Sequence, residues 1–204
     1  MAKRIKVGKT SKEGFLQKNF GQGIKYINDS RKFIYSAVII FLAFALVGYF
    51  LPVPDVLSEK ILKFVEELLS QTEGMSWSQL LGFIFFNNLQ SSFFGMILGI
   101  FFGLFSIVAL VANGYLIGFV SRIVSEKEGI LVLWRLLPHG IFEIPAILIS
   151  TGLGIKLGTF IFQKKGKETL KEIILKSLKA FFFVIVPLLI IAALIESSLI
   201  YLLG

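Results

Sequence analysis

The side chains that could do chemistry gather in one short apolar stretch. Residues 137–146 read LPHGIFEIPA and hold His139, the single histidine of the chain, and the acid Glu143. Arg135 precedes them, so the three ionisable groups are spaced i, i+4, i+8 and share a face if one helix continues through Pro138. If a new helix begins at Pro138, His139 and Glu143 fall in its first two turns. Either arrangement brings His139 and Glu143 close enough to pair.

Two interpretations of this polar cluster remain open. Ionisable groups are costly in hydrocarbon, so they indicate a partner, a cavity or a function. His139 and Glu143 could relay protons or ions across a bundle whose helices are broken. Alternatively, the cluster is a satisfied polar lock, in which asparagine amides hydrogen-bond with the ionisable groups and fix the register of the helices. The full cluster consists of Arg135, His139, Glu143, Asn87, Asn88 and Asn113.

Enzyme chemistry has weaker support in these residues. One histidine and one carboxylate supply at most half of a zinc site, and the sequence has no HExxH motif. No nucleophile motif marks Ser92, Ser106 or Ser150 as a partner for His139. The chain has no cysteine, which excludes thiolate chemistry and disulfides. We expect no enzyme, no cofactor and no metal, with an intramembrane metal-dependent or serine hydrolase as the alternative.

The composition indicates a membrane protein. Of its 204 residues 55% are hydrophobic and 17% are charged, whereas about 25% of a soluble domain is charged. The apolar residues come in runs of the length that crosses a bilayer, about 20 residues of helix. Basic loops on the cytoplasmic side explain the net charge of +8. We therefore expect a lipid bilayer as a partner, and no nucleic acid.

Charge patterning predicts which side of the membrane each segment occupies. Residues 1–32 are rich in Lys and Arg and predict a basic cytoplasmic arm, either an amphipathic helix or a loosely ordered segment. A single transmembrane domain, 33–204, follows and opens with a span over 33–51. Residues 52–78 are acidic and amphipathic, which predicts an outer segment, and the lysine-rich residues 163–179 predict an inner loop.

Five spans satisfy these assignments, because an odd number of crossings must separate the outer segment from the inner loop and three crossings fulfil that rule. The clearest of the three runs from Phe93 to Ala112, and the dipeptide Asn113-Gly114 after it is typical of a turn. Two short apolar pieces then flank 125–129. We predict an all-α integral membrane helical bundle of about five transmembrane helices, with broken or re-entrant segments around 80–137. Its C-terminus lies outside the cell membrane.

Glycines recur four residues apart along the predicted spans. Such a stripe removes side chains from one helix face, so that another helix can pack closely. Lys156 lies among these glycines near the inner end of the fourth span, 138–162, and is expected to snorkel to the surface. The glycines predicted to pack helices are Gly95, Gly99, Gly103, Gly114, Gly118, Gly154 and Gly158.

Three motifs carry a resemblance to a known family. They are FNNLQSSFFGMILGIFFG over 86–103, ANGYLIG over 112–118 and LPHGIFEIPAILISTGLGIKLG over 137–158. In order and spacing the chain resembles the stage II sporulation protein M family, from about residue 25 to the end. The resemblance implies a small multi-pass membrane fold. The family's namesake works with two partner proteins that degrade septal peptidoglycan, and relatives occur in organisms that do not sporulate, including archaea.

Two functions are therefore expected to compete. The first is a scaffold or assembly component of a cell-envelope complex, which the resemblance implies. It would assemble with itself or with envelope proteins through the glycine stripes and the outer amphipathic segment. The second is a small oligomeric transporter or channel that uses the site at His139 and Glu143.

Overall fold

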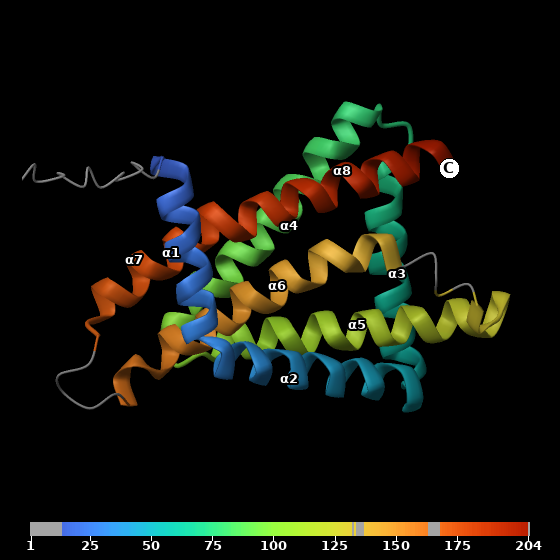
Figure 1. The fold of residues 1–204 in the computed structure, drawn as a ribbon. Helices are drawn as coiled ribbons and strands as arrows, with labels where there is room; N and C mark the ends of the chain where they lie inside the picture. The colour runs from blue at the N-terminus through green and yellow to red at the C-terminus, as the bar shows by residue number, and fades with distance from the viewer. Residues whose placement is uncertain (1–13, 132, 134–136, 163–167, 204) are drawn as a thin grey trace, which may run out of the picture.

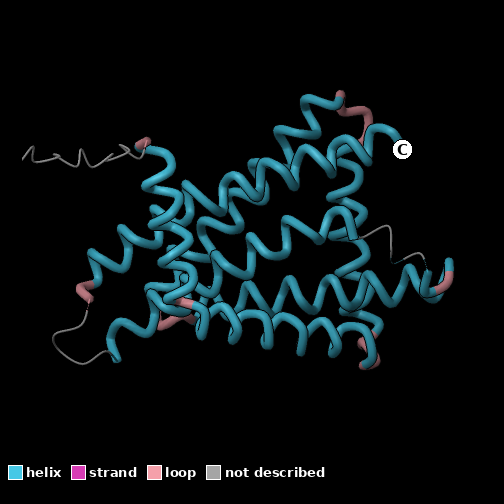
Figure 2. The backbone as a smooth tube through the Cα atoms, viewed as in Figure 1, coloured by secondary structure: helices cyan, strands magenta, loops and turns pink. Residues whose placement is uncertain are grey.

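The computed structural model describes residues 14–131, 133, 137–162 and 168–203. The described residues form helices joined by turns and loops, without a strand among them (Figure 2). In chain order the elements are α1 (Phe15–Asp29), α2 (Arg31–Phe50), α3 (Asp55–Thr72), α4 (Trp77–Ile97), the short helix η1 (Leu98–Ile100), α5 (Leu104–Glu128), α6 (Leu137–Gly158), η3 (Thr159–Phe162), α7 (Leu170–Ala180), the π-helical η4 (Phe181–Ile185) and α8 (Val186–Leu203).

Five of the described helices are long and apolar enough to cross a membrane. A span needs about 20 predominantly apolar residues. The five segments are Arg31–Phe50, Trp77–Ile100, Leu104–Glu128, Gly140–Phe162 and Leu170–Leu202. The predicted all-α membrane bundle of about five transmembrane helices is therefore confirmed.

α6 lies at the centre of this bundle, where it packs against α2, α4, α5 and α8 (Figure 1). Leu153 and Leu157 of α6 are fully buried in the main hydrophobic core, together with Met96 of α4 and Leu189 of α8. A second core cluster joins Phe41 of α2 to α5 and α6. Both core clusters therefore depend on α6, which carries the motif LPHGIFEIPA at its start.

A sharp turn separates α4 from α5. Phe102 and Gly103 both have positive φ, 57° and 73°, a conformation that glycine adopts without cost and phenylalanine rarely does. The prediction of one span from Phe93 to Ala112 is therefore wrong, because the chain reverses at 101–103. The four-residue spacing suggested one continuous helix because Gly95, Gly99 and the turn residue Gly103 all face α6.

The predicted turn at Asn113-Gly114 is also wrong. Both residues lie inside α5, which runs from Leu104 to Glu128 and so continues from residues 104–112 into the short apolar piece 115–124. Glycine is needed at position 114 for helix packing and not for a turn, because a Cβ there would overlap the backbone of Phe41 in α2. Gly129, with a φ of 86°, follows as the residue that ends the helix.

The helix that carries the last span begins at Leu170, inside the residues 163–179 that the sequence predicts as an inner loop. Thr169 accepts a hydrogen bond from the Glu172 amide, and the Glu172 side chain accepts one from the Thr169 amide. This capping box starts α7 at Leu170. The helix continues through the π-helical η4 into α8. Pro187 has no N–H to donate, and the wider turn just before it accommodates that gap.

α1 and α3 lie across the two opposite ends of the bundle (Figure 1). α1 packs on α7 and η4, where its Gly23 approaches the Ala180 backbone and its Tyr26 enters the main core. α3 connects α2 to α4 and has no fully buried residue among those described. α1 is thus packed onto the bundle, whereas α3 is exposed.

Candidate functional site

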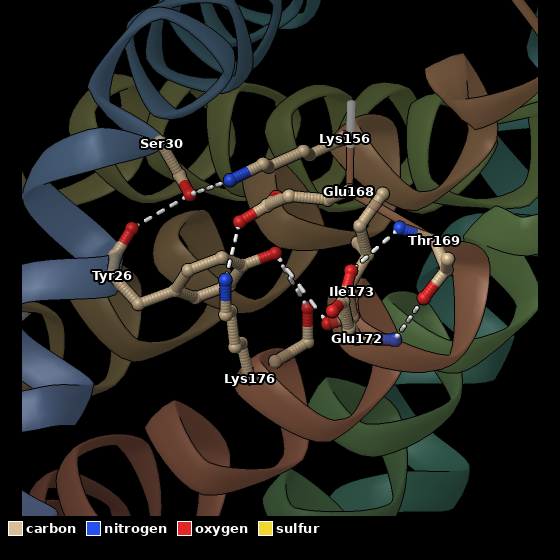
Figure 3. A network of polar contacts seen from close by, with 9 residues as sticks. Tyr26, Ser30, Lys156, Glu168, Thr169, Glu172, Ile173 and Lys176 are labelled. Carbon is tan, nitrogen blue, oxygen red and sulfur yellow. Dashed lines mark hydrogen bonds and ion pairs between the residues drawn. The ribbon is translucent and has the colours of Figure 1, made fainter. Parts of the chain in front are cut away.

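A buried lysine lies at the α1 end of the bundle. Lys156, near the end of α6, is only 8% exposed. Its Nζ donates a hydrogen bond to Ser30 Oγ at 3.0 Å and lies 3.9 Å from the centroid of the Tyr26 ring (Figure 3). Ser30 Oγ in turn donates to the Tyr26 carbonyl at 2.7 Å. The snorkelling predicted for Lys156 is therefore wrong: its ammonium is held inside the protein by a hydroxyl and a ring.

Tyr26 connects α1 to α7 at this site. Its hydroxyl donates to the Ile173 carbonyl at 3.4 Å and accepts from Ser177 Oγ at 3.4 Å. Burial raises the pKa of Tyr26 to about 12, because the phenolate would lose its hydration. The ring thus remains neutral at physiological pH and presents its electron-rich face to Lys156.

Further charged and polar side chains on α1 and α7 surround this core. Lys176 Nζ forms an ion pair with Glu168, and Lys179 Nζ donates to Gln22 Oε1 at 2.6 Å. Lys25 and Asp29, both exposed, lie on the facing side of α1. These groups surround a cavity of about 370 Å³, which is lined by Gln22, Lys25, Tyr26, Asp29, Lys156, Glu168, Leu175, Lys176 and Lys179.

The polar cluster predicted from the sequence lies partly outside the described residues. Arg135 is among the residues that the structure does not describe. His139 falls in the first turn of α6, but its side chain is likewise outside the described set. Glu143 follows one turn later and is half-buried.

The three asparagines of the predicted cluster do not share one environment. Asn88 is buried on α4, whereas its neighbour Asn87 is exposed. Asn113 donates from Nδ2 to the Ala109 carbonyl of its own helix at 2.8 Å. The amide of Asn113 is therefore used within α5 and does not bridge to another span.

Two of the three serines considered as nucleophiles, Ser106 and Ser150, connect neighbouring segments. Ser106 Oγ of α5 donates to the Gly95 carbonyl of α4 at 2.6 Å. Ser150 Oγ of α6 donates to the Ser92 carbonyl of α4. Hydroxyl-to-carbonyl bonds of this kind hold helices together where water is absent.

The predicted packing glycines all lie against other elements of the same chain. A Cβ on Gly99 would overlap the Gly154 backbone, and one on Gly158 would overlap the turn at Gly103. Similarly, Gly118 lies against Ala45 of α2, and a Cβ on Gly95 would lie 3.2 Å from the methyl group of Thr151. These surfaces are already covered within the monomer. The expectation that the glycine stripes serve as contact surfaces for partners is thus wrong.

The network around Lys156 was missed because Tyr26 and Ser30 are distant from it in sequence. One signal could have pointed to it. Gly152 lies one turn before Lys156 on the same face of α6, and a Cβ there would overlap the backbone of Ile34 in α2. A glycine four residues before a lysine thus indicates that another backbone packs closely on the face that carries the lysine.

The bundle defines this protein as a small multi-pass helical membrane protein. The chain belongs to the SpoIIM family, described as stage II sporulation protein M, which matches residues 37–199. This confirms the resemblance seen in the three motifs.

Two uncharacterized proteins of Methanocaldococcus jannaschii are similar to this chain. One is 37% identical over 116 residues, which cover 54% of this chain and 65% of that protein. The other is 29% identical over 173 residues, which cover 82% of this chain and 77% of that protein. No solved structure matches the chain. The similarity to proteins of an archaeon agrees with the expected relationship to organisms that do not sporulate.

Proposed function

We propose that the protein is a membrane scaffold, an assembly component of a cell-envelope complex. Its N-terminus lies in the cytoplasm and its C-terminus outside, as the basic segments 1–32 and 163–179 indicate. It assembles with itself or with other envelope proteins. The observation that carries this proposal is the uncovered apolar face of α3.

α3 presents apolar side chains that the rest of the chain does not cover. Val56 is 69% exposed and Phe64 is 49% exposed, and Leu57 and Leu62 of the same helix are also exposed. The acids Glu59, Glu66 and Glu67 of the same helix are exposed as well. An amphipathic helix with a free apolar face at the membrane surface is suited to contact either lipid or another protein.

The interior of the bundle supports a structural role for the spans. Ser106 and Ser150 direct their hydroxyls to carbonyls of α4, and the glycine contacts bring the backbones of α4 and α6 together. Groups committed to such contacts are not available to bind a permeating solute. This packing favours a scaffold over a transporter.

Photo-crosslinking in membranes tests the scaffold. A photoreactive residue replaces Phe64 on α3, and a control replaces Leu46, which is 58% exposed on α2. We expect discrete protein adducts from position 64 and lipid adducts from position 46. The proposal fails if position 64 gives only lipid adducts in the native membrane.

A flux assay tests the transporter alternative directly. The purified protein is reconstituted into liposomes that contain a pH-sensitive dye, together with the variants His139→Ala and Glu143→Gln. We expect proton flux no greater than that of empty liposomes. A flux that the original chain supports and both variants lose would replace the scaffold by a transporter.

A further inference from the structure

The cavity beside Lys156 has the chemistry of an anion site. Four of its lining residues are lysines (Lys25, Lys156, Lys176 and Lys179), and two are acids (Asp29 and Glu168). Lysines are thus in excess around a volume of about 370 Å³, which is in the range that small-molecule sites occupy.

The buried ammonium is the group that distinguishes this cavity from an ordinary charged surface. Of the two acids that line the cavity, Glu168 forms an ion pair with Lys176, and both Glu168 and Asp29 attract the Lys156 ammonium at longer range. Lys156 Nζ has Ser30 Oγ and the Tyr26 ring as its partners. An ammonium carries three N–H donors, and a buried charge is costly without an anion in direct contact with it. An anion in the cavity would offset that cost.

The surrounding network holds Lys156 in place for such a ligand. Ser30 and Tyr26 belong to the junction of α1 and α2, and Tyr26 is fixed to α7 through Ile173 and Ser177. The ammonium of Lys156 on α6 lies over the Tyr26 ring, and that of Lys176 on α7 points to Glu168 (Figure 3). α6 and α7 thus each contribute a lysine to the lining of the cavity.

We propose that the cavity between α1, α6 and α7 binds a phosphate-type oxyanion, with Lys156 as its buried contact. Ammonium groups bind phosphate as compact point charges. The cavity lies at the end of the bundle where the lysine-rich segments predict the cytoplasmic surface. The phosphate can therefore come from the headgroup of an anionic lipid or from a soluble phosphate ester. This site does not depend on the scaffold function.

The test uses the full-length protein in nanodiscs of phosphatidylcholine. In one arm, soluble glycerol phosphate is titrated in; in the other, phosphatidylglycerol replaces part of the lipid. The readout is the midpoint of thermal unfolding, because a ligand that binds the folded state raises it. Native mass spectrometry measures the phosphatidylglycerol that stays bound.

Two lysines serve as variant and matched control. Lys156→Met keeps the length of the side chain and removes its charge. Lys32→Met removes an exposed lysine at the start of α2, outside the cavity. We expect the apparent affinity to fall at least about tenfold in Lys156→Met, as the loss of a charge-assisted hydrogen bond predicts, and less than about twofold in Lys32→Met. If Lys156→Met does not fold, Lys25→Met at the cavity rim provides the same comparison.

The two arms identify the source of the phosphate. A saturable response to phosphatidylglycerol alone assigns a lipid headgroup, and a response to glycerol phosphate assigns a soluble ester. No response to either probe overturns the proposal. An equal loss in Lys156→Met and Lys32→Met also overturns it, because that pattern reflects the general surface charge.

Discussion

Gly99 and Gly154 touch backbone to backbone. Gly99 lies in η1 at the end of the second span, Gly154 lies in α6, and a Cβ on Gly99 would overlap the Cα, carbonyl carbon and oxygen of Gly154. The hydroxyl of Ser106 fills the space beside them and would meet a Cβ on Gly154. Two glycines that are far apart in the sequence thus fix how closely the central helix approaches the turn between α4 and α5.

Gly99→Ala should destabilise the folded monomer. The added methyl group forces the two backbones apart, and overpacking of this kind costs about 1–3 kcal/mol. Gly82→Ala on α4 is the matched control, because its Cβ would meet no atom within 4 Å. We expect that control to be neutral or slightly stabilising, since alanine favours helix. Unfolding by SDS titration in mixed micelles measures both; equal free energies of unfolding for the two variants would contradict the prediction.

Phe102→Gly should leave stability unchanged or raise it. Phe102 has a φ of 57°, and a non-glycine residue in that conformation costs about 1 kcal/mol. Its neighbour Phe101 has a φ of −79° and is comparably exposed, so Phe101→Gly removes a similar ring without relieving strain. We expect that control to lose about 0.5–1 kcal/mol. The same SDS titration compares the two, and the prediction is wrong if Phe102→Gly is the more damaging change.

Deprotonation of the Tyr26 hydroxyl should lower the free energy of unfolding at alkaline pH. Folding raises its pKa from 10.0 to about 12, so the protonated form is the one that the folded state favours. The stabilisation is therefore complete below pH 10 and is lost as the pH rises toward 12, by about 2–3 kcal/mol in total. Tyr26→Phe should lack this component of the pH dependence. Tyr35→Phe, whose ring is exposed on α2, should retain it.

Measuring the free energy of unfolding of all three proteins at several values between pH 9 and 12 tests this effect. Other groups titrate in the same range, so the informative quantity is the difference between each variant and the original chain. The prediction is wrong if the difference in free energy of unfolding between Tyr26→Phe and the original chain stays constant with pH. That result would mean that the Tyr26 hydroxyl has the same pKa in the folded and unfolded states.

The sequence predicts the class of fold well because membrane spans have strong signals of their own. The first span, predicted at 33–51, corresponds to α2 at Arg31–Phe50, and the outer segment 52–78 contains α3. Long apolar runs, basic flanks and the proline at residue 52 are local features. They require no knowledge of which helix packs against which.

The errors arise where local patterns have more than one physical cause. The glycines of 95–103 predicted one continuous helix face, but the chain reverses there because Gly103 permits a left-handed turn. Gly114 was interpreted as a turn residue and is a packing residue. Composition could not separate these roles, since both require the absence of a side chain.

The site around Lys156 could not be derived from the sequence, because its partners come from three distant segments. Ser30 is 126 residues from Lys156, and Tyr26 is 147 residues from Ile173. Only the packing of α1 across the end of the bundle brings them together. The predicted cluster at His139 and Glu143 was easier to see, because its members follow one another in the chain.

The contact between α2 and α5 constrains the order in which the protein can assemble. These helices lie side by side (Figure 1), and Gly114 and Gly118 fit against Phe41 and Ala45. They are not consecutive spans, so α2 leaves the ribosome well before its partner exists. α4 is likewise synthesised before its main neighbours, which are α6 and α8. The first two spans must therefore remain in the bilayer with bare packing surfaces during synthesis, and the bundle closes only as its C-terminal half arrives.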